Sequence, residues 1–388
     1  MRESLGRRDY YIASDPEPLV GQYGYPASRG LASTMVTSER QYDDARLSDE
    51  ALAPYRCDVS YVSNQSGQPS TFHAERRQWF VKDSGAIRLA DFLYEMLADA
   101  YARRKPDIYI EREHLLARAE QATGARPGSP EARDALLNSY LYPLAELMLR
   151  QTTLEWVADY CDRKGRTLYL FGNGWESHPR FARYARGTAK NGAELRAIYQ
   201  ASAVNLQIIG TGAIHQRLLD GLAAGGFFLI RYSPGDVLHT LFQRYLDAVR
   251  RRPVELDRPY EPGELPEVAA ALRDLWVFRG LEPQIDRIVV SAGRMRIFQR
   301  MEASGYRQFA GAVFPEYGDV SFDSPEAFER AAERFLGDAE ARRRVAQSMR
   351  TVVVGRYSYA ALTRELLALI DRCIAQEEPA GAVRGAQD

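Results

Sequence analysis

The hydrophobic pattern of the chain changes its period near residue 165. Before this point, apolar residues recur every three or four positions, as in amphipathic helices. Helices are predicted there over 86–104, 129–150 and 152–165. After it, short apolar runs alternate with helical segments. Strands are predicted over 167–172, 204–210 and 227–231, and helices over 192–203, 213–224 and 235–252. This alternation favours an α/β fold with a parallel sheet covered on both faces.

The flanking regions add further predicted elements. Residues 56–64 predict another strand, which runs into the polar loop NQSGQPS. Residues 1–56 are rich in Gly, Pro, Ser and Tyr, with one short strand expected at DYYIAS. Further helices are expected over 264–276, 292–305 and 358–374, and a strand over 287–290. Ser129, Ser324 and Ser358 are expected N-caps, and Pro143 should kink or split its helix.

Composition removes several classes of protein. The formal net charge of −1 gives no overall field toward nucleic acid or a membrane. Three cysteines without a CxxC pair support neither a disulfide framework nor a zinc site. The first residues lack the apolar core of a signal peptide, and no apolar run reaches the roughly 18 residues of a membrane span. These features predict a cytoplasmic protein without a membrane span.

The glycine-rich stretch IIGTGAIHQRLLDGLAAGGFFLI (208–230) contains most of a dinucleotide fingerprint. The third small residue of that fingerprint is replaced by His215. The following strand ends in Arg231, where a carboxylate would bind the ribose. An NAD(P)-dependent oxidoreductase is therefore an alternative that two residues argue against.

The same turn still favours a phosphate. If the strand ends at Gly210 and the helix begins near Ala213, the unpaired N–H groups of the first helical turn and the positive end of the helix dipole would both attract a phosphate there. His215 and Arg217 in the first helical turn would add positively charged donors. Asp220 could accept hydrogen bonds from ribose hydroxyls, or it could pair with Arg217 at i,i+3.

The ordered motifs resemble a known family. TLYLFGNGWE, ARGTAKNGAELRAIYQASAVNLQI and HQRLLDGLAAGGFFLI are similar to the nucleotide-binding half of GT-B glycosyltransferases, especially the branch resembling spore-maturation protein CgeB. CDVSYVSN resembles the strand that opens the C-terminal domain of that family, and 322–370 resembles its closing helices. The resemblance covers roughly residues 56–375.

The resemblance implies a role for each matching position. Residues 173–175 would lie near the sugar donor, and 187–190 beside its base. His215 and Arg217 would stabilise the leaving diphosphate, and Asp220 would bind the ribose. The full donor-binding set is Asn173, Gly174, Trp175, Gly187, Thr188, Lys190, Gly212, His215, Arg217, Asp220, Gly225 and Gly226.

The chain also departs from the family. The acidic residue that many retaining enzymes carry eight positions before Asp220 is here Gly212. Fewer than 60 residues precede CDVSYVSN, so residues 1–56 are interpreted as a remnant or reduced N-terminal domain. Residues 57–376 would form the nucleotide-sugar-binding domain, with a helical insertion at about 86–164. Residues 377–388 would be a disordered tail.

The working hypothesis is a metal-independent glycosyltransferase that needs no cofactor and uses a nucleotide-diphospho-sugar. The acceptor is unknown, and a partner chain or a homo-oligomer could complete its site. His73, His114 and His178 are candidate bases by residue type only, and none is assigned. The alternatives are a non-catalytic nucleotide-sugar-binding or scaffold protein and the oxidoreductase named above.

Overall fold

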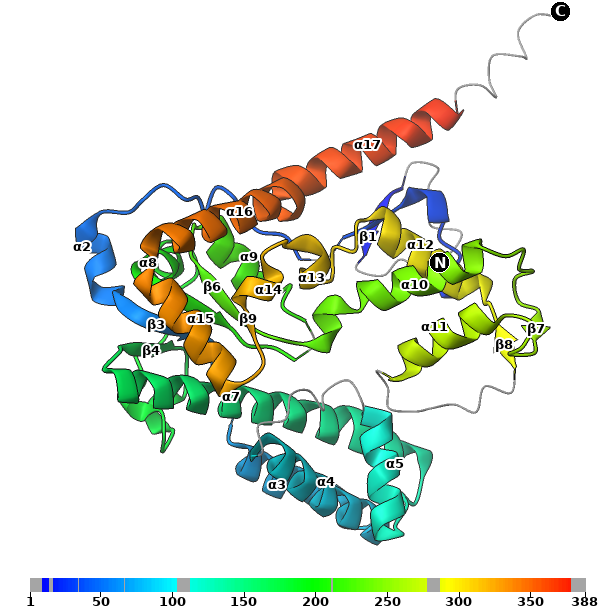
Figure 1. The fold of residues 1–388 in the computed structure, drawn as a ribbon, viewed down its shortest axis with the longest axis horizontal. Helices are drawn as coiled ribbons and strands as arrows, with labels where there is room; N and C mark the ends of the chain where they lie inside the picture. The colour runs from blue at the N-terminus through cyan, green and yellow to red at the C-terminus, as the bar shows by residue number, and fades with distance from the viewer. Residues whose placement is uncertain are drawn as a thin grey trace, which may run out of the picture.

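A five-stranded parallel sheet lies at the centre of the computed structural model (Figure 1). The structure describes residues 9–13, 17–33, 35–65, 67–102, 112–210, 212–277 and 287–377. The strands are β3 (Cys57–Val62), β4 (Leu168–Phe171), β5 (Ser202–Gln207), β6 (Phe228–Arg231) and β9 (Ser321–Phe322). All neighbouring pairs are parallel, which confirms the predicted α/β class with a Rossmann-like parallel sheet.

Helices cover both faces of this sheet. On one side, α15 (Pro325–Gly337) packs against α7 (Tyr142–Lys164). On the other, α8 (Ala193–Ala201), α9 (Gln216–Ala223) and α16 (Ala339–Tyr357) pack together. Figure 1 shows α7 below the sheet and α8, α9 and α16 above it. Burial on both faces explains why the strands are nearly continuous apolar runs.

The helical segment between β3 and β4 has a hydrophobic cluster of its own. It contains α3 (Pro69–Arg77), α4 (Ser84–Ala102), α5 (Arg112–Thr123), α6 (Pro130–Asp134), a π-helix (Ala135–Leu141) and the first half of α7. Pro143 is the second residue of α7, which follows the π-helix directly, so the expected break in the α-helix is present. Ser129 caps α6, as predicted, by accepting the N–H of Ala132.

The helix boundary predicted at residues 150–152 is wrong. Helix α7 runs without interruption from Tyr142 to Lys164. The hydroxyl of Thr153 donates to the carbonyl of Leu149 at 2.7 Å, so this threonine is satisfied inside a continuous helix. The helix ends at Gly165, as predicted, in a left-handed conformation with φ +64°.

A third hydrophobic cluster lies beyond β6. It joins α10 (His239–Arg250), α11 (Pro266–Val277) and α12 (Ala292–Ala303) to the short antiparallel pair β7 (Pro259–Tyr260) and β8 (Ile288–Val289). The sequence pattern predicted elements here but no separate core. This cluster lies at the right of Figure 1, away from the strands of the main sheet.

The chain ends of the described region add smaller elements. Strands β1 (Tyr11–Ala13) and β2 (Gly30–Ala32) pair in parallel around α1 (Glu17–Tyr23), and α2 (Asp49–Leu52) precedes β3. Short helices α13 (Ala310–Val313) and α14 (Tyr317–Val320) lead into β9. Helix α17 (Tyr359–Glu377) closes the fold, and Ser358 caps it by accepting the N–H of Ala361. The tail expected beyond Glu377 lies outside the described residues.

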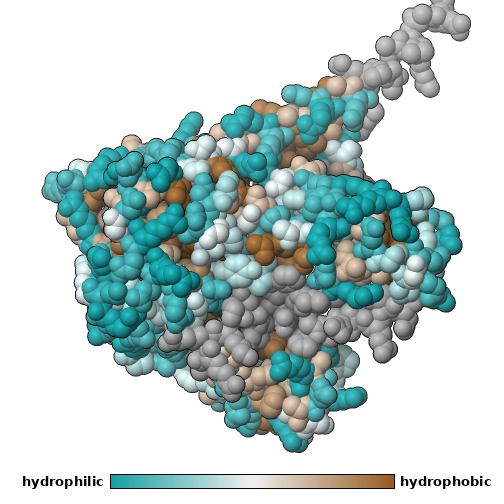
Figure 2. Space-filling view, in the orientation of Figure 1, coloured by the Kyte–Doolittle hydropathy of each residue, from teal (hydrophilic) through white to brown (hydrophobic). Residues whose placement is uncertain are grey.

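No helix in the described ranges is both long and apolar enough to cross a bilayer. The face drawn in Figure 2 is mainly hydrophilic, with small hydrophobic patches scattered over it.

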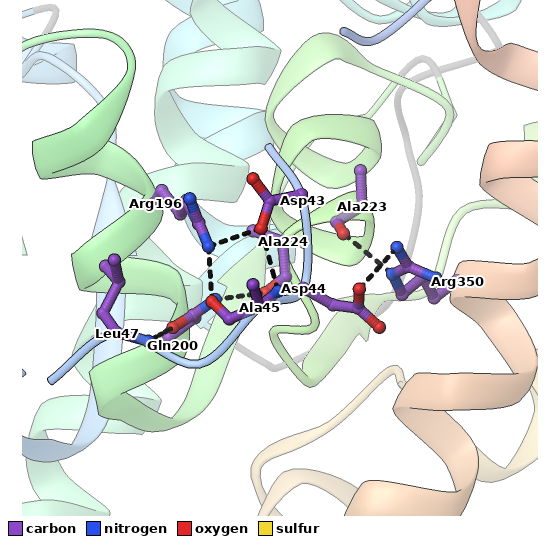
Figure 3. Close-up of polar contacts among 9 residues, drawn as sticks. All are labelled: Asp43, Asp44, Ala45, Leu47, Arg196, Gln200, Ala223, Ala224 and Arg350. Carbon is purple, nitrogen blue, oxygen red and sulfur yellow. Dashed lines mark hydrogen bonds and ion pairs between the residues drawn. The ribbon is translucent and has the colours of Figure 1, made fainter. Parts of the chain in front are cut away.

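Residues 35–47 form an irregular segment with one turn at 39–42, called the strap below, that contacts helices α8, α9 and α16. Its backbone pairs with the junction between α16 and α17 through Thr37 and Ser358. Figure 3 shows its other end: Asp43 pairs with Arg196 of α8, and Asp44 pairs with Arg350 of α16 at 2.8 Å. The strap therefore holds α8, α9 and α16 to one another.

We expect Thr37→Val to lower the free energy of unfolding by about 1–3 kcal/mol. Thr37 is fully buried, and its hydroxyl donates to the buried carboxylate of Asp220 at 2.7 Å. Valine keeps the shape of threonine but has no hydroxyl, so the buried carboxylate of Asp220 would lose one of its hydrogen-bond donors. Denaturant unfolding measures the loss. The control is Thr363→Val on the exposed face of α17, which should change stability by less than about 0.5 kcal/mol. Equal losses in the two variants would contradict the assigned role of the strap.

Candidate functional site

The order of the strands marks one edge of the sheet as the place for a ligand. Across the sheet the order is β4-β3-β5-β6-β9, which in chain order is 2-1-3-4-5. In such doubly wound sheets, ligands bind outside the carboxyl ends of the strands where the winding direction reverses. Here that point lies between β3 and β5. It is bordered by the loops that begin at Ser63 and Ile208.

The loops after β3 and β4 are joined by backbone contacts. The N–H of Asn173 donates to the Asn64 side chain at 2.9 Å, and the N–H of Gln65 donates to the Asn173 carbonyl at 2.8 Å. Gly172 has φ +137°, and a Cβ on it would lie 2.3 Å from the Ser63 carbonyl oxygen. Asn173 is exposed beside this junction, and Gly174 also has a positive φ of +87°. The two loops are therefore held tightly to each other at the carboxyl ends of β3 and β4.

Trp175 is part of the core rather than a surface residue. Its side chain is only 2% exposed, and its indole N–H donates to the Ser63 carbonyl at 2.6 Å. Its ring lies edge-on to Tyr61, with 6.4 Å between the centroids. This burial leaves no face of Trp175 for a ligand. Trp175 instead supports the loop that carries Asn173.

The glycine turn after β5 is bound by carboxylates of the chain itself. The N–H of Gly210 donates to Glu146 of α7 at 2.9 Å, and the N–H of Ala213 donates to Asp236 at 2.7 Å. Asp236 is fully buried and also accepts the hydroxyl of Tyr317 at 2.8 Å. Gly212 has φ +132° between these contacts. Two N–H groups that the sequence offered to a phosphate are thus already satisfied.

These contacts also move the start of the following helix. Helix α9 begins at Gln216, not near Ala213 as predicted, and His215 is its N-cap without a side-chain capping bond. The carboxylate of Asp236 holds Ala213 in the loop, so the first helical turn forms three residues later. The free N–H groups of a helix start are consequently those that follow His215.

Positively charged side chains meet at this helix start. His215 lies close enough to Arg217 and to Arg150 of α7 for both cations to lower the pKa of its imidazole, after the larger effect of burial. Its Nδ1 is buried and has no hydrogen-bond partner in the described part of the chain. Arg217 donates to Gln207 at 3.3 Å and lies over the ring of Tyr61. The cations Arg150 and Arg217, with the imidazole of His215 that can take up a proton, are named the cationic trio below.

Asp220 does not face the cationic trio. It is 6% exposed and accepts hydrogen bonds from Thr37 and Gln216, each at 2.7 Å. No ion pair with Arg217 is found among the described residues, so the alternative pairing at i,i+3 is not formed. Burial raises the pKa of its carboxyl, and the two hydrogen bonds oppose this rise. In this structure Asp220 anchors the strap, and no ribose could reach it without displacing Thr37.

The loop after the short helix at Ala182–Tyr184 lies beside the end of β4. The Gly187 carbonyl accepts the N–H of Gly172 at 2.8 Å, and Gly187 has φ +76°. Thr188 and Lys190 are exposed, and the N–H of Lys190 donates to Glu194 at 3.0 Å. Gly187 is therefore held beside the end of β4, and Thr188 and Lys190 follow it in an exposed loop.

Gly225 and Gly226 lie at the opposite edge of the sheet. They precede the amino end of β6, whereas Gly212 and His215 follow the carboxyl end of β5. A Cβ on Gly226 would lie 2.9 Å from the Tyr199 carbonyl oxygen, so this glycine permits close packing against the end of α8. Their inclusion in one donor site with Gly212 is a correction to the sequence analysis.

Both candidate bases whose side chains the structure describes, His178 and His73, already take part in hydrogen bonds. His178 is 5% exposed, and its Nδ1 accepts the backbone N–H of Arg180 at 3.2 Å. His73 lies in the helical segment, where its Nδ1 contacts the hydroxyl of Tyr140 at 2.6 Å. The side chain of His114 is outside the described residues. No base is assigned on this basis.

Three residues of the crevice were missed by sequence reasoning. Asp236 lies five residues after the end of β6, a position at which ligand-binding groups are common in such folds, so SPGD after the strand was a usable signal. Glu146 and Arg150 lie inside a long helix whose packing brings them to the sheet. Nothing in the local pattern distinguished them from core-flanking polar residues.

Comparisons with known proteins add no family to this geometry. A scan against protein-family models found no match, and neither did searches of curated proteins and of solved structures. The class that fold and crevice define is therefore an α/β protein with a doubly wound parallel sheet.

Proposed function

We propose that the chain binds a nucleotide-diphospho-sugar in the crevice between β3 and β5 and transfers its sugar, as a GT-B-like glycosyltransferase. The observation that carries the proposal is the cationic trio at the start of α9. Arginine and histidine at a helix N-terminus suit a diphosphate, because charged donors and the helix dipole act together on it. The resemblance of the motifs to the GT-B nucleotide-binding half supplies the sugar and the reaction class.

In the proposed reaction, the bond between the anomeric carbon and the diphosphate oxygen breaks and its electron pair moves to the diphosphate. Arg217 and His215 would stabilise this growing charge more than the charge of the bound donor, which is how a binding group accelerates a step. The oxygen of an acceptor hydroxyl forms the new bond, and its proton passes to a base that is not assigned. The transfer is proposed to need no metal. A partner chain or second copy that completes the acceptor site belongs to the same proposal.

A non-catalytic nucleotide-sugar-binding or scaffold protein is the second candidate. Its supporting observation is that Glu146 and Asp236 occupy two N–H donors of the glycine turn. The hydrogen bond from Thr37 of the strap to Asp220 also supports this candidate, because it occupies the carboxylate expected to bind the ribose. The oxidoreductase hypothesis has less support, because Arg231 at the end of β6 is 1% exposed and donates to backbone carbonyls.

A ligand screen with nucleotide sugars tests donor binding. UDP-, GDP-, TDP- and CMP-sugars and NADPH are compared by thermal shift, with a rise of about 2 °C or more expected for the correct donor. Arg217→Ala should abolish the shift, whereas Arg330→Ala on the exposed face of α15 should retain it. A shift with NADPH alone, or none with any sugar nucleotide, would overturn the proposal. Release of nucleoside diphosphate by the wild type, lost in Arg217→Ala, separates the enzyme from the scaffold.

Donor affinity should rise as the pH falls from about 8 to about 5.5, by roughly three- to tenfold. Burial and the two arginines lower the pKa of His215, so the free protein holds this imidazole neutral near pH 7. A bound diphosphate raises that pKa, and the proton taken up on binding makes affinity greater on the acidic side. Calorimetric titration at fixed ionic strength measures the trend. His215→Gln should bind with little pH dependence. An unchanged slope in this variant would show that another group titrates.

A further inference from the structure

A second concave surface lies at the amino ends of the strands, opposite the crevice described above. The cavity has a volume of about 770 Å³. Its walls come from the end of the strap at Asp44 and Arg46, the segment from α2 to the start of β3, the C-terminal ends of α8 and α9, and the start of α16. Volumes of about 300–1,000 Å³ are those of small-molecule sites.

Four arginines line this cavity on two facing walls. Arg46 and Arg56 stand on the wall before β3, and Arg342 and Arg343 stand on the first turns of α16. Arg46 and Arg56 share a single carboxylate, that of Asp49, at 3.4 Å and 2.6 Å.

The remaining carboxylates of the lining are already balanced. Asp44 pairs with Arg350 at 2.8 Å, as Figure 3 shows, and Asp58 pairs with Arg166 at 3.4 Å. Within the described ranges, neither Arg342 nor Arg343 has a carboxylate at ion-pair distance. Two carboxylates act on the four arginines, Asp49 on one wall and Asp338 beside Arg342 on the other, so the cavity carries an excess of positive charge.

Arg342 and Arg343 are consecutive residues near the start of α16. Arg342 donates to the Phe335 carbonyl at the end of α15, which fixes the direction of its side chain. Its pKa is lowered first by burial and then by the neighbouring charge of Arg343. An anion between them would relieve this repulsion, and guanidinium groups bind phosphate oxygens in a bidentate manner.

We propose that this cavity binds a small polyanion with two or more phosphate groups. Phosphates supply the charge density that an excess of arginines requires, and the concave shape selects a small molecule rather than an extended strand. The site is separate from the proposed donor crevice, because the sheet lies between the two edges.

Inorganic tripolyphosphate is the probe for the test, in calorimetric titrations of the full chain at about 150 mM salt. Wild type is expected to bind it saturably, and Arg342→Gln/Arg343→Gln to bind it at least roughly tenfold more weakly. The control is Arg330→Gln/Arg344→Gln, which removes the same charge from exposed positions outside the cavity and should bind as wild type does. Arg217→Ala should also retain this binding.

Several outcomes would overturn the proposal. The first is no saturable binding by wild type. The second is an equal loss in both double variants, which would indicate unspecific attraction. The third is a loss in Arg217→Ala alone, which would place the polyanion in the other crevice. If Arg342→Gln/Arg343→Gln proves unstable by its melting curve, Arg343→Gln alone serves instead, because no hydrogen bond of its side chain is found in the described structure. A change in stability without a change in binding would show that the arginines only offset the C-terminal dipoles of α8 and α9.

Discussion

Replacing Gly172 with alanine is expected to lower the free energy of unfolding by about 3 kcal/mol or more. The new Cβ would lie 2.3 Å from the Ser63 carbonyl oxygen, which is backbone and cannot rotate away. The residue also has φ +137°, a region that L-residues rarely adopt. Relief would require the loops after β3 and β4 to separate, and their hydrogen bonds at Asn173 would be lost. Urea denaturation measures the change.

Gly187→Ala is the matched control for this prediction. Gly187 also has a positive φ, +76°, and its carbonyl accepts the N–H of Gly172, but no atom lies within 4 Å of its Cβ position. Only backbone strain remains, so a loss of about 1 kcal/mol is expected. If the two variants lose the same amount, close approach of the loops is not what requires glycine at position 172.

Asp236→Ala should be similarly damaging, with a loss of about 3 kcal/mol. The buried carboxylate accepts the N–H of Ala213 and the hydroxyl of Tyr317, and both donors would be left desolvated. The glycine turn at 210–213 would lose one of its two anchors. The proposed donor binding should therefore weaken together with stability, as chemical denaturation and the thermal-shift screen would show.

Two further variants test whether the loss of stability at Asp236 comes from its buried hydrogen bonds or from the removal of a negative charge. Asp236→Asn keeps an acceptor oxygen of the same shape and should lose less than Asp236→Ala. Asp319→Ala removes an exposed carboxylate that pairs with Arg334 at 3.1 Å, and it should change stability by less than about 1 kcal/mol. A loss at Asp236 no larger than that at Asp319 would refute the assigned anchoring role.

The sheet was predictable because its information is local. Val204, Leu206 and their neighbours form a short apolar run between helical patterns, and parallel strands buried on both faces have that pattern. The N-caps at Ser129 and Ser324 could also be predicted from the sequence, because a capping side chain binds an N–H only three residues later. The order of the strands followed from neither signal.

The site was less predictable because its contacts join distant residues. Asp220 was interpreted from the helix around it, but its partner Thr37 lies 183 positions away. The N–H groups of the glycine turn were treated as free, because Glu146 and Asp236 reach them only in the folded chain. Gly225 was assigned to the donor site from a motif that spans α9, and a helix separates the groups at its two ends. A sequence motif contains no information on this distance in space.

The strap also has a consequence for the order of folding. Thr37 is synthesised early, whereas Ser358, with which it pairs, follows more than 300 residues later. Arg196 and Arg350, which hold Asp43 and Asp44, also come later than the strap. Contacts of such high sequence separation carry a large loop-closure cost and form slowly. During translation, the contacts of the strap with Arg350 and Ser358 can therefore form only after nearly the whole chain has been synthesised.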